Sequence, residues 1–186
     1  MKQDNGEIAT DYIVMMNRCR DHYFHLECLQ GQLNSNEYLE CSTCKVMYGI
    51  KTGDQPKGTM SWSKEAFACD GFASDVKTWV IQYEFPSGIN PETNEKFHGD
   101  GRTGFIPDTE EGRKVLALLV ECFRRRLTFT VGFSVVRGRD NCIVWNGVHH
   151  KTRTHGGSTH YGYPDDTYLN RVQQEMALKG VVFHNE

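Results

Sequence analysis

Six cysteine and histidine residues near the start of the sequence have types and spacings that suit a metal ion. They form three short-spaced pairs, Cys19 with His22, His25 with Cys28, and Cys41 with Cys44. Thiolates and imidazoles delivered in pairs from separate turns are the usual tetrahedral ligands of zinc. A redox-active Cys41–Cys44 motif with incidental histidines is the alternative. Three such pairs within so short a segment favour zinc.

A second group of chemically capable residues lies in two glycine-rich segments, 145–152 and 156–165. It includes His149, His150 and Tyr161. Glycines let a backbone approach a ligand closely, and aromatic rings stack on bases, so a nucleotide-like ligand is one interpretation. A loop histidine that only satisfies local hydrogen bonds is the other. A metal held by His149 and His150 together is disfavoured because adjacent residues seldom point at one ion.

The composition restricts the class of protein. The chain has 186 residues, of which 38% are hydrophobic and 24% charged, with a formal net charge of -3. This composition is typical of a globular protein, and its slight acidity disfavours a nucleic-acid binder that relies on a basic surface. No apolar run approaches the ~20 residues that span a membrane. Residues 1–11 are too polar for a signal peptide.

The cysteine count indicates the redox compartment. Seven cysteines, a CxxC pair and the polar start favour a reducing compartment over a disulfide framework. We therefore expect the cytoplasm, with the nucleus as a second location. Cys69, Cys122 and Cys142 stand in apolar surroundings and are expected to be small buried side chains.

Hydrophobic periodicity then predicts the elements that position these groups. Alternation predicts a half-buried strand over 79–85, ended by Pro86 and Gly88, and further strands over 127–133 and 142–145. A helix is expected to begin within 107–111, with acids in its first turn. The residues expected on its buried face are Val115, Leu116, Leu118, Leu119, Cys122 and Phe123.

Two further features complete the predicted α+β fold with a mainly antiparallel sheet. Arg124–Arg126 suit the negative end of the first helix dipole, which favours a solvated helix end over a binding patch. A last helix is expected to open at 164–166 and close at Gly180, with three inward residues. These are Leu169, Val172 and Met176.

The cysteine–histidine cluster resembles the second part of a RING domain, in which eight ligands bind two zinc ions in a cross-braced order. The resemblance implies one complete zinc site, made by Cys19, His22, Cys41 and Cys44. The other site has only His25 and Cys28, because residues 1–18 contain neither cysteine nor histidine.

The resemblance to a RING has two departures and one further match. Two residues separate Cys19 from His22 where one is usual, and Ser42 stands where proline commonly follows the seventh ligand. Lys45 occupies the basic position that steadies the ubiquitin thioester in active RING domains.

The longer remainder resembles the Deltex C-terminal domain, from about Met47 to Val182. The motifs that carry this resemblance occur in the expected order behind a RING: Tyr48–Met60, Gly112–Leu116, Phe129–Gly132, Trp145–Thr152 and Tyr161–Asp165. We therefore divide the chain into a partial RING-type module, 1–46, and a Deltex C-terminal domain, 47–186. Tyr161 makes the chain look closest to the Deltex 3-like branch.

The resemblance implies a RING-type ubiquitin ligase that takes ubiquitin from a charged ubiquitin-conjugating enzyme. In this family the C-terminal domain binds ADP-ribose and NAD+, which recruits ADP-ribosylated proteins or couples ADP-ribose to ubiquitin. The implied groove residues are His149, Tyr161, Tyr163 and Glu175, with His149 and Glu175 as the catalytic pair. Without the resemblance, Glu175 and Lys179 would be a helix surface pair. Notch signalling is a further family association.

Two other functions stay open. One is a non-catalytic reader of ADP-ribose whose RING is degenerate, because the first ligand pair is missing. The other is a zinc-dependent nucleic-acid binder, which the net charge of -3 disfavours.

Overall fold

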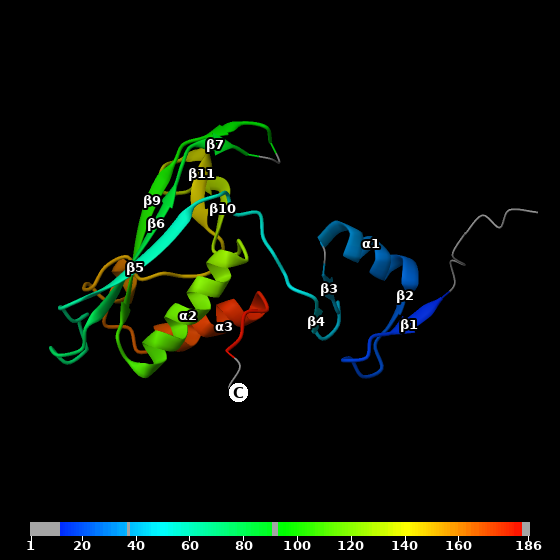
Figure 1. The fold of residues 1–186 in the computed structure, drawn as a ribbon, viewed down its shortest axis with the longest axis horizontal. Coiled ribbons are helices and arrows are strands. Elements are labelled where there is room, and N and C mark those ends of the chain that lie inside the picture. Colours follow the sequence, from blue (N-terminus) through cyan, green and yellow to red (C-terminus); the bar gives the residue numbers. More distant parts are fainter. Residues whose placement is uncertain (1–11, 37, 91–92, 184–186) are drawn as a thin grey trace, which may run out of the picture. The chain divides into compact units, whose positions relative to one another are not determined.

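The computed structural model describes residues 12–36, 38–90 and 93–183, which belong to two compact units (Figure 1). The N-terminal unit ends at Thr52 and the C-terminal unit begins at Gly53. The sequence had placed this boundary near Val46. The division lies later because β4 (Met47–Tyr48) pairs with β3 (Leu39–Glu40) and so belongs to the N-terminal unit.

The N-terminal unit contains short strands and one helix around a small core. β1 (Ile13–Met15) pairs antiparallel with β2 (Tyr23–His25), and α1 (Leu26–Asn36) follows directly. The buried core consists of Met16, Cys19, Leu29 and Cys41. Two of these four residues are predicted metal ligands. So small an apolar core supplies little stability alone, and such units usually need a metal or another cross-link.

The C-terminal unit is built on antiparallel strands covered by two helices. β5, β6 and β9 form a three-stranded sheet in that order, and β7–β8 and β10–β11 form two hairpins. α2 and α3 pack against each other, and α2 also contacts β9 (Figure 1). The predicted α+β fold with antiparallel strands is thus confirmed in the described residues.

The strands predicted over 79–85, 127–133 and 142–145 correspond to β6, β10 and β11, and the two predicted helices correspond to α2 and α3. The strands are β5 (Thr59–Glu65), β6 (Thr78–Phe85), β7 (Gly88–Ile89), β8 (Lys96–Phe97), β9 (Asp100–Pro107), β10 (Phe129–Ser134) and β11 (Arg139–Trp145). The helices are α2 (Glu110–Arg124), the short 3-10 helix η1 (Ser158–His160) and α3 (Tyr168–Leu178).

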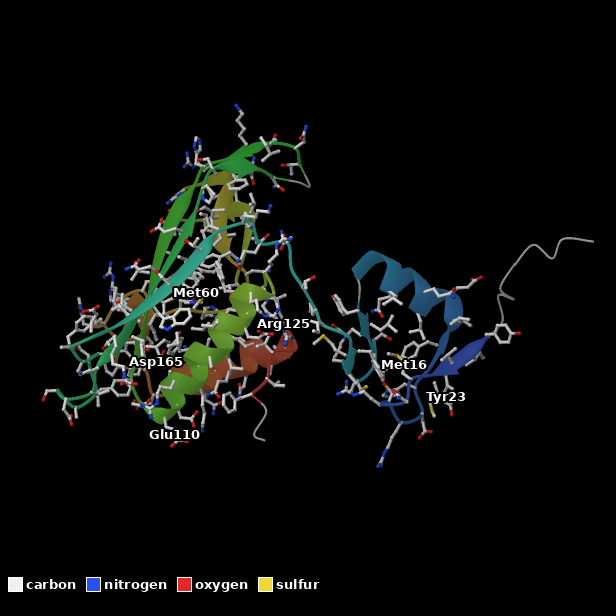
Figure 2. The ribbon with its side chains drawn as sticks, viewed as in Figure 1. Met16, Tyr23, Met60, Glu110, Arg125 and Asp165 are labelled. Carbon is white, nitrogen blue, oxygen red and sulfur yellow. The ribbon has the colours of Figure 1, made fainter. Side chains whose placement is uncertain are left out.

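One continuous core joins the sheet to both helices. It contains the inward residues of β6, the buried face of α2, and Val172 and Met176 of α3. Figure 2 shows side chains filling the space between the sheet and the helices. Cys69, Cys122 and Cys142 are buried, as predicted from their apolar surroundings.

The ends of α2 are fixed by specific contacts. The Thr109 hydroxyl caps the helix by accepting from the Gly112 N–H at 3.0 Å. A Cβ on Gly112 would lie 1.9 Å from the Pro107 carbonyl oxygen, so no other residue fits there without backbone movement. Figure 2 shows Glu110 and Arg125 at opposite ends, which suits the helix dipole. Arg125 also pairs with Glu121 and donates to the Gly180 carbonyl.

The last residue of the strand predicted over 127–133 departs from the burial of its neighbours. Phe129 is buried, whereas Phe133 is exposed. The strand pairing shifts register between Gly132 and Ser134. An extra residue in one strand of an antiparallel pair breaks the regular alternation of faces.

Asp108 holds the start of α2 against the sheet. Its carboxylate pairs with Lys64 of β5 at 2.7 Å and Arg113 of α2 at 3.0 Å, and accepts from the Trp79 indole N–H at 3.0 Å. The Lys64 hydrogen bond is the largest cause of a pKa lowered to about 2; burial opposes it, and Arg113 and Trp79 reinforce it.

This depressed pKa gives the contribution of Asp108 a defined pH dependence. An aspartate whose folded pKa lies below its unfolded value of about 3.9 stabilises the fold fully above that value. The stabilisation is lost as pH falls toward about 2. We expect Asp108→Asn to lower the free energy of unfolding by about 1–3 kcal/mol at pH 6. The difference should shrink toward zero near pH 2 in urea unfolding followed by circular dichroism. The exposed Asp166→Asn is the control, and a difference independent of pH would contradict the assignment.

Candidate functional site

Four of the predicted metal ligands converge in the N-terminal unit. The ligand atoms of Cys19, His22, Cys41 and Cys44 all lie within 4.8 Å of one another. Cys19 and His22 come from the turn between β1 and β2, whereas Cys41 and Cys44 come from the turn between β3 and β4. Two hairpin turns distant in sequence therefore present one four-ligand set. This cluster can hold a metal ion.

The turn containing Cys41 and Cys44 is shaped around the Cys41 sulfur. The Cys44 N–H donates to Cys41 Sγ at 3.4 Å, and the Lys45 N–H donates to the Cys41 carbonyl at 2.9 Å. Lys45 adopts φ of 62°, in the left-handed region that few non-glycine residues occupy. The Cys44 bond thus directs a backbone donor toward the Cys41 sulfur, while the Lys45 bond closes the turn.

The two buried thiols of the cluster differ in acidity. Burial is the largest influence on both and raises the pKa. For Cys19 the pKa stays raised, whereas for Cys41 the hydrogen bonds from the Cys44 and Thr43 backbone outweigh burial and lower the pKa to about 6. Cys41 is thus prepared to act as an anionic ligand, which is the form that binds metals.

His25 and Cys28 form the predicted incomplete pair. Both are exposed, His25 at the end of β2 and Cys28 in the first turn of α1, and both line one shallow hollow. Within 12–36, 38–90 and 93–183, the only group of three or more possible ligands is the cluster described above. The structure therefore brings no further cysteine, histidine or carboxylate of these ranges to His25 and Cys28.

Lys45 follows the last ligand of the cluster directly. Its side chain is 69% exposed, and its Nζ lies 3.5 Å from Glu40 Oε1. So weak and exposed an ion pair leaves the ammonium group accessible to solvent.

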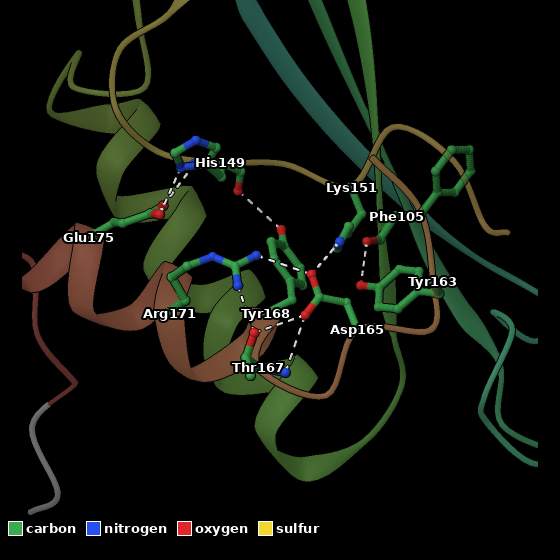
Figure 3. A network of polar contacts seen from close by, with 9 residues as sticks. All are labelled: Phe105, His149, Lys151, Tyr163, Asp165, Thr167, Tyr168, Arg171 and Glu175. Carbon is green, nitrogen blue, oxygen red and sulfur yellow. Dashed lines mark hydrogen bonds and ion pairs between the residues drawn. The ribbon is translucent and has the colours of Figure 1, made fainter. Parts of the chain in front are cut away.

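The C-terminal unit brings together the predicted pair His149 and Glu175. His149 Nδ1 lies 2.7 Å from Glu175 Oε1, and the His149 backbone N–H donates to Glu175 Oε2 at 2.9 Å (Figure 3). A carboxylate only accepts, so Nδ1 carries the proton and Nε2 keeps a lone pair in the neutral ring. The glutamate is mostly buried whereas the histidine is 68% exposed. This pair can accept a proton at a surface-accessible nitrogen.

The neighbouring His150 has a different role. It is buried, its Nδ1 donates to the Val148 carbonyl at 3.0 Å, and its Nε2 accepts from the Tyr83 hydroxyl at 2.8 Å. Its ring stacks on Trp145 with centroids 4.1 Å apart. Burial lowers the pKa of His150 to about 4, so it is neutral near neutral pH. It is a structural residue of the cavity wall.

A buried ion pair fixes the backbone that carries both histidines. Lys151 Nζ lies 2.6 Å from Asp165 Oδ2, with side chains 4% and 5% exposed (Figure 3). Arg171 of α3 binds the same carboxylate oxygen at 3.1 Å. Burial raises the pKa of Asp165, but the hydrogen bonds from Lys151, Arg171 and Thr167 outweigh it and hold the pKa well below its usual range.

α3 organises the site from one face. Tyr168, Arg171 and Glu175 lie three and four residues apart, a spacing that places side chains on the same side of a helix. Tyr168 donates its hydroxyl to the His149 carbonyl at 3.2 Å, while Glu175 accepts from the same residue. The helix thus holds His149 by its carbonyl, its amide and its ring.

The two predicted tyrosines lie in different environments. Tyr161 is 66% exposed, has φ of 57°, and lines a cavity of about 380 Å³. Its carbonyl accepts from the Thr152 and Arg153 N–H groups, which fixes this uncommon conformation. Tyr163 is fully buried and donates its hydroxyl to the Phe105 carbonyl at 3.0 Å. It does not line the cavity.

The cavity has contributors that the sequence patterns did not single out. Val136 at the tip of the β10–β11 hairpin and the ring of Trp145 line it together with His149, His150 and Tyr161. No local motif marks Val136, because only the tertiary fold brings the hairpin to the glycine-rich segments. The buried pairing of Lys151 with Asp165 was equally invisible, since both residues look like loop charges in sequence.

Fold and site together define an α+β domain with an open cavity, joined in sequence to a small unit whose cysteines and histidine could hold a metal ion. Residues 52–181 match the model of the Deltex C-terminal domain. The chain is 39% identical over 186 residues to "E3 ubiquitin-protein ligase DTX1" of Mus musculus, covering 95% of this chain and 29% of that protein. It is 41% identical over 171 residues to "Probable E3 ubiquitin-protein ligase DTX3" of Homo sapiens, covering 89% and 48%.

The chain belongs to the Deltex family. Similarity to "E3 ubiquitin-protein ligase DTX4" of Mus musculus is 38% over 183 residues, so identity differs little between the branches. The chain spans between about a third and a half of the length of these relatives. In the described part of the chain, no helix is long and apolar enough to cross a membrane.

The buried Lys151–Asp165 pair predicts a large stability effect at this site. Lys151→Met keeps the apolar stem but leaves Asp165 without its most buried partner. Removing one member of a buried ion pair typically costs about 3–5 kcal/mol, and we expect about 3 kcal/mol because Arg171 remains. Chemical unfolding of this variant beside the exposed Lys57→Met measures the difference. Equal stability of the two variants would show that the pair does not hold the loop.

Proposed function

We propose that this chain is the catalytic part of a RING-type E3 ubiquitin ligase with an ADP-ribose and NAD+ site. The observation that supports it best is the direct contact of His149 with Glu175 beside the open cavity. Membership in a family whose relatives are named E3 ubiquitin-protein ligases supports the same conclusion. The partners would be a charged ubiquitin-conjugating enzyme, ubiquitin and ADP-ribosylated proteins.

The four-ligand cluster fits zinc in both donor type and spacing. With Zn–S near 2.3 Å and Zn–N near 2.05 Å, a tetrahedron has S–S edges of about 3.8 Å and S–N edges of about 3.6 Å. Cys19 Sγ and Cys44 Sγ are 3.6 Å apart, and Cys41 Sγ lies 3.5 Å from His22 Nδ1. Cys19, His22, Cys41 and Cys44 would therefore hold zinc, which would fix the two hairpin turns together without taking part in bond making.

The chemistry proposed for the C-terminal unit is base-assisted acyl transfer. His149 Nε2 would take the proton of a ribose hydroxyl as that oxygen attacks the carbonyl carbon of the ubiquitin thioester. The carbon–sulfur bond breaks, the thiolate leaves with the conjugating enzyme, and an ester joins ribose to ubiquitin. Glu175 would fix the histidine tautomer and stabilise the imidazolium that forms.

The remaining proposed roles follow from how exposed each side chain is. Tyr161 would stack on the ligand, because its ring is exposed at the cavity and its backbone is fixed. Tyr163 would act indirectly, because its side chain is buried and its hydroxyl bonds to the Phe105 carbonyl. Lys45 would steady the thioester held at the N-terminal unit. A reducing location in cytoplasm or nucleus and a role in Notch signalling stay predictions.

A second candidate is a non-catalytic ADP-ribose reader with a degenerate RING. The observation that favours it is the pair His25 and Cys28, which gains no third ligand from the described residues. A RING that binds one zinc in place of two would position a conjugating enzyme poorly, so the unit would act through a partner ligase.

The His149–Glu175 assignment predicts selective loss of one activity. We expect His149→Ala to slow ADP-ribose-directed ubiquitin transfer by about 100-fold or more, the usual contribution of a general base. Glu175→Gln should also slow this transfer, while ADP-ribose-independent autoubiquitination persists in both variants. Gel assays with a charged conjugating enzyme measure the two activities. His155→Ala, in the same loop but not lining the cavity, is the control. Full ADP-ribose-directed activity in both His149→Ala and Glu175→Gln would contradict the assignment.

Zinc stoichiometry separates the ligase from the reader. We expect native mass spectrometry to find zinc at the four-ligand cluster, and Cys41→Ala to lose this ion and to unfold the N-terminal unit only. Cys142→Ala, outside the cluster, should keep the metal. Two zinc ions per chain would favour a complete RING and hence the ligase, whereas one favours the reader. No zinc at all would contradict the metal assignment.

A further inference from the structure

A second cavity in the C-terminal unit shares no lining residue with the His149 cavity. Its volume is about 380 Å³, and its lining comes from the segment that precedes β5, from β7 and β8, and from β10. The segment before β5 runs beside β10 (Figure 1). Two motifs of the sequence, Tyr48–Met60 and Phe129–Gly132, contribute to this lining, and the proposed function uses neither.

Alternate residues of the segment before β5 face the core and the cavity. Gln55 is 2% exposed, and its Oε1 accepts from the Thr128 and Phe129 N–H groups at 3.2 and 3.1 Å. These bonds fix the backbone of the segment at the start of β10. Asp54 and Pro56, on either side of Gln55, line the cavity. The core thus holds one residue of the segment, and its neighbours are presented at a defined position.

Two cations of the lining have no anionic partner in the part of the chain that the structure describes. Lys57 and Arg126 are both exposed, and the one bond of the Arg126 side chain runs from Nε to the Gln55 carbonyl at 2.7 Å. Asp54, the acidic residue of the lining, accepts from the Thr130 hydroxyl. The rim is therefore positive in a chain whose net charge is -3, which suits a ligand that carries carboxylates.

Most of the remaining lining is apolar. Ile89 is 51% exposed, which would need no explanation for a single apolar residue. It lies, however, at one cavity with four other apolar side chains, namely Pro56, Pro86, Phe97 and Val131. An apolar floor beside a positive rim selects a ligand that is aliphatic and anionic together.

The backbone of residues 86–90 borders the cavity. All five of these consecutive residues line it, although alternate side chains of an extended strand point to opposite faces. The Asn90 N–H donates to the Glu95 carbonyl at 2.8 Å. Bonded and non-bonded pairs alternate along an antiparallel ladder, so the N–H and C=O of Ile89, which pairs with Lys96, point away from β8. Among the described strands β7 pairs with β8 alone, and its other edge can accept a further strand.

We propose that this cavity binds an extended segment of a partner protein in which carboxylate and aliphatic side chains alternate. The segment adds as a strand to the free edge of β7, its carboxylates pair with Lys57 and Arg126, and an aliphatic side chain contacts Ile89 and Val131. In strand addition, main-chain bonds supply affinity and pockets for alternate side chains supply specificity. A small carboxylic acid would leave the β7 edge unused. The site is separate from His149, so the inference does not rest on the proposed function.

Fluorescence anisotropy on the intact chain tests the charge and the apolar contact. The probe is a labelled pool of peptides of about six residues, a usual strand length, in which Asp or Glu alternates with Ile, Leu or Val. A second pool carries Lys or Arg in place of the acids and should not bind. We expect Lys57→Glu to weaken binding of the acidic pool about three- to tenfold, because an ion pair becomes a like-charge contact. Ile89→Ser should weaken it about threefold or more. Lys96→Glu, exposed on β8 but outside the lining, is the charge control and should bind as wild type.

Methylation of the peptide backbone tests strand addition itself. Two further acidic pools carry N-methyl groups on the amides of either the acidic or the aliphatic residues. We expect one of these pools to lose binding and the other to keep it, because only one edge of an added strand faces β7. Equal binding of the two methylated pools overturns strand addition.

Three other results overturn the inference. The first is an acidic pool that does not bind the wild-type chain, or binds no better than the basic pool. The second is an affinity that is unchanged in both Lys57→Glu and Ile89→Ser, which places the peptide elsewhere. The third is equal weakening by Lys57→Glu and Lys96→Glu, which shows a general effect of charge. None of these results bears on ubiquitin transfer, so failure here is distinct from failure of the proposed function.

Discussion

The candidate site depends on the buried ion pair between Lys151 and Asp165. Two charges with almost no solvent access are tolerated only when each is well paired. Lys151 also lies over the rings of Tyr163 and Tyr168, which adds favourable cation–π contacts. Because Lys151 follows the two histidines directly, anchoring its side chain limits where His149 can lie. Arg171 joins the same carboxylate from α3, so helix and loop are linked through one oxygen atom.

The two units obtain their stability from different sources. The C-terminal unit has a continuous core in which β6, α2 and α3 interdigitate. Among the described residues of the N-terminal unit, the buried apolar cluster consists of four residues, two of which are cysteines of the ligand cluster. A metal at that cluster would replace the missing core, because metal binding is coupled to folding when no preformed site exists in the unfolded chain. Metal removal would therefore act on one unit and spare the other.

Much of the fold was predictable because it follows local rules. The spacing of apolar residues predicts the buried face of α2, and Thr109 is of a type that caps helices. The alternation from Trp79 to Phe85 predicts β6. The exposed Phe133 was not predictable, since a bulge depends on the partner strand. At the site, the resemblance to the Deltex motifs named His149 and Glu175 together, and their side chains are in contact, although the two residues lie 26 positions apart in the sequence. Val136 and the Lys151–Asp165 pair required the tertiary structure.

Adjacent histidines with opposite environments explain how this loop combines rigidity with reactivity. His150 is buried and neutral, bonded at both nitrogens and stacked on Trp145, so it holds the cavity wall. The His149 side chain is exposed, and its Nδ1 is hydrogen-bonded to Glu175. The rigid neighbour restricts the backbone of His149, so less conformational entropy would be lost if a ligand were positioned there. A single histidine could not serve both purposes, because burial that fixes the ring also lowers its pKa and blocks access to its second nitrogen.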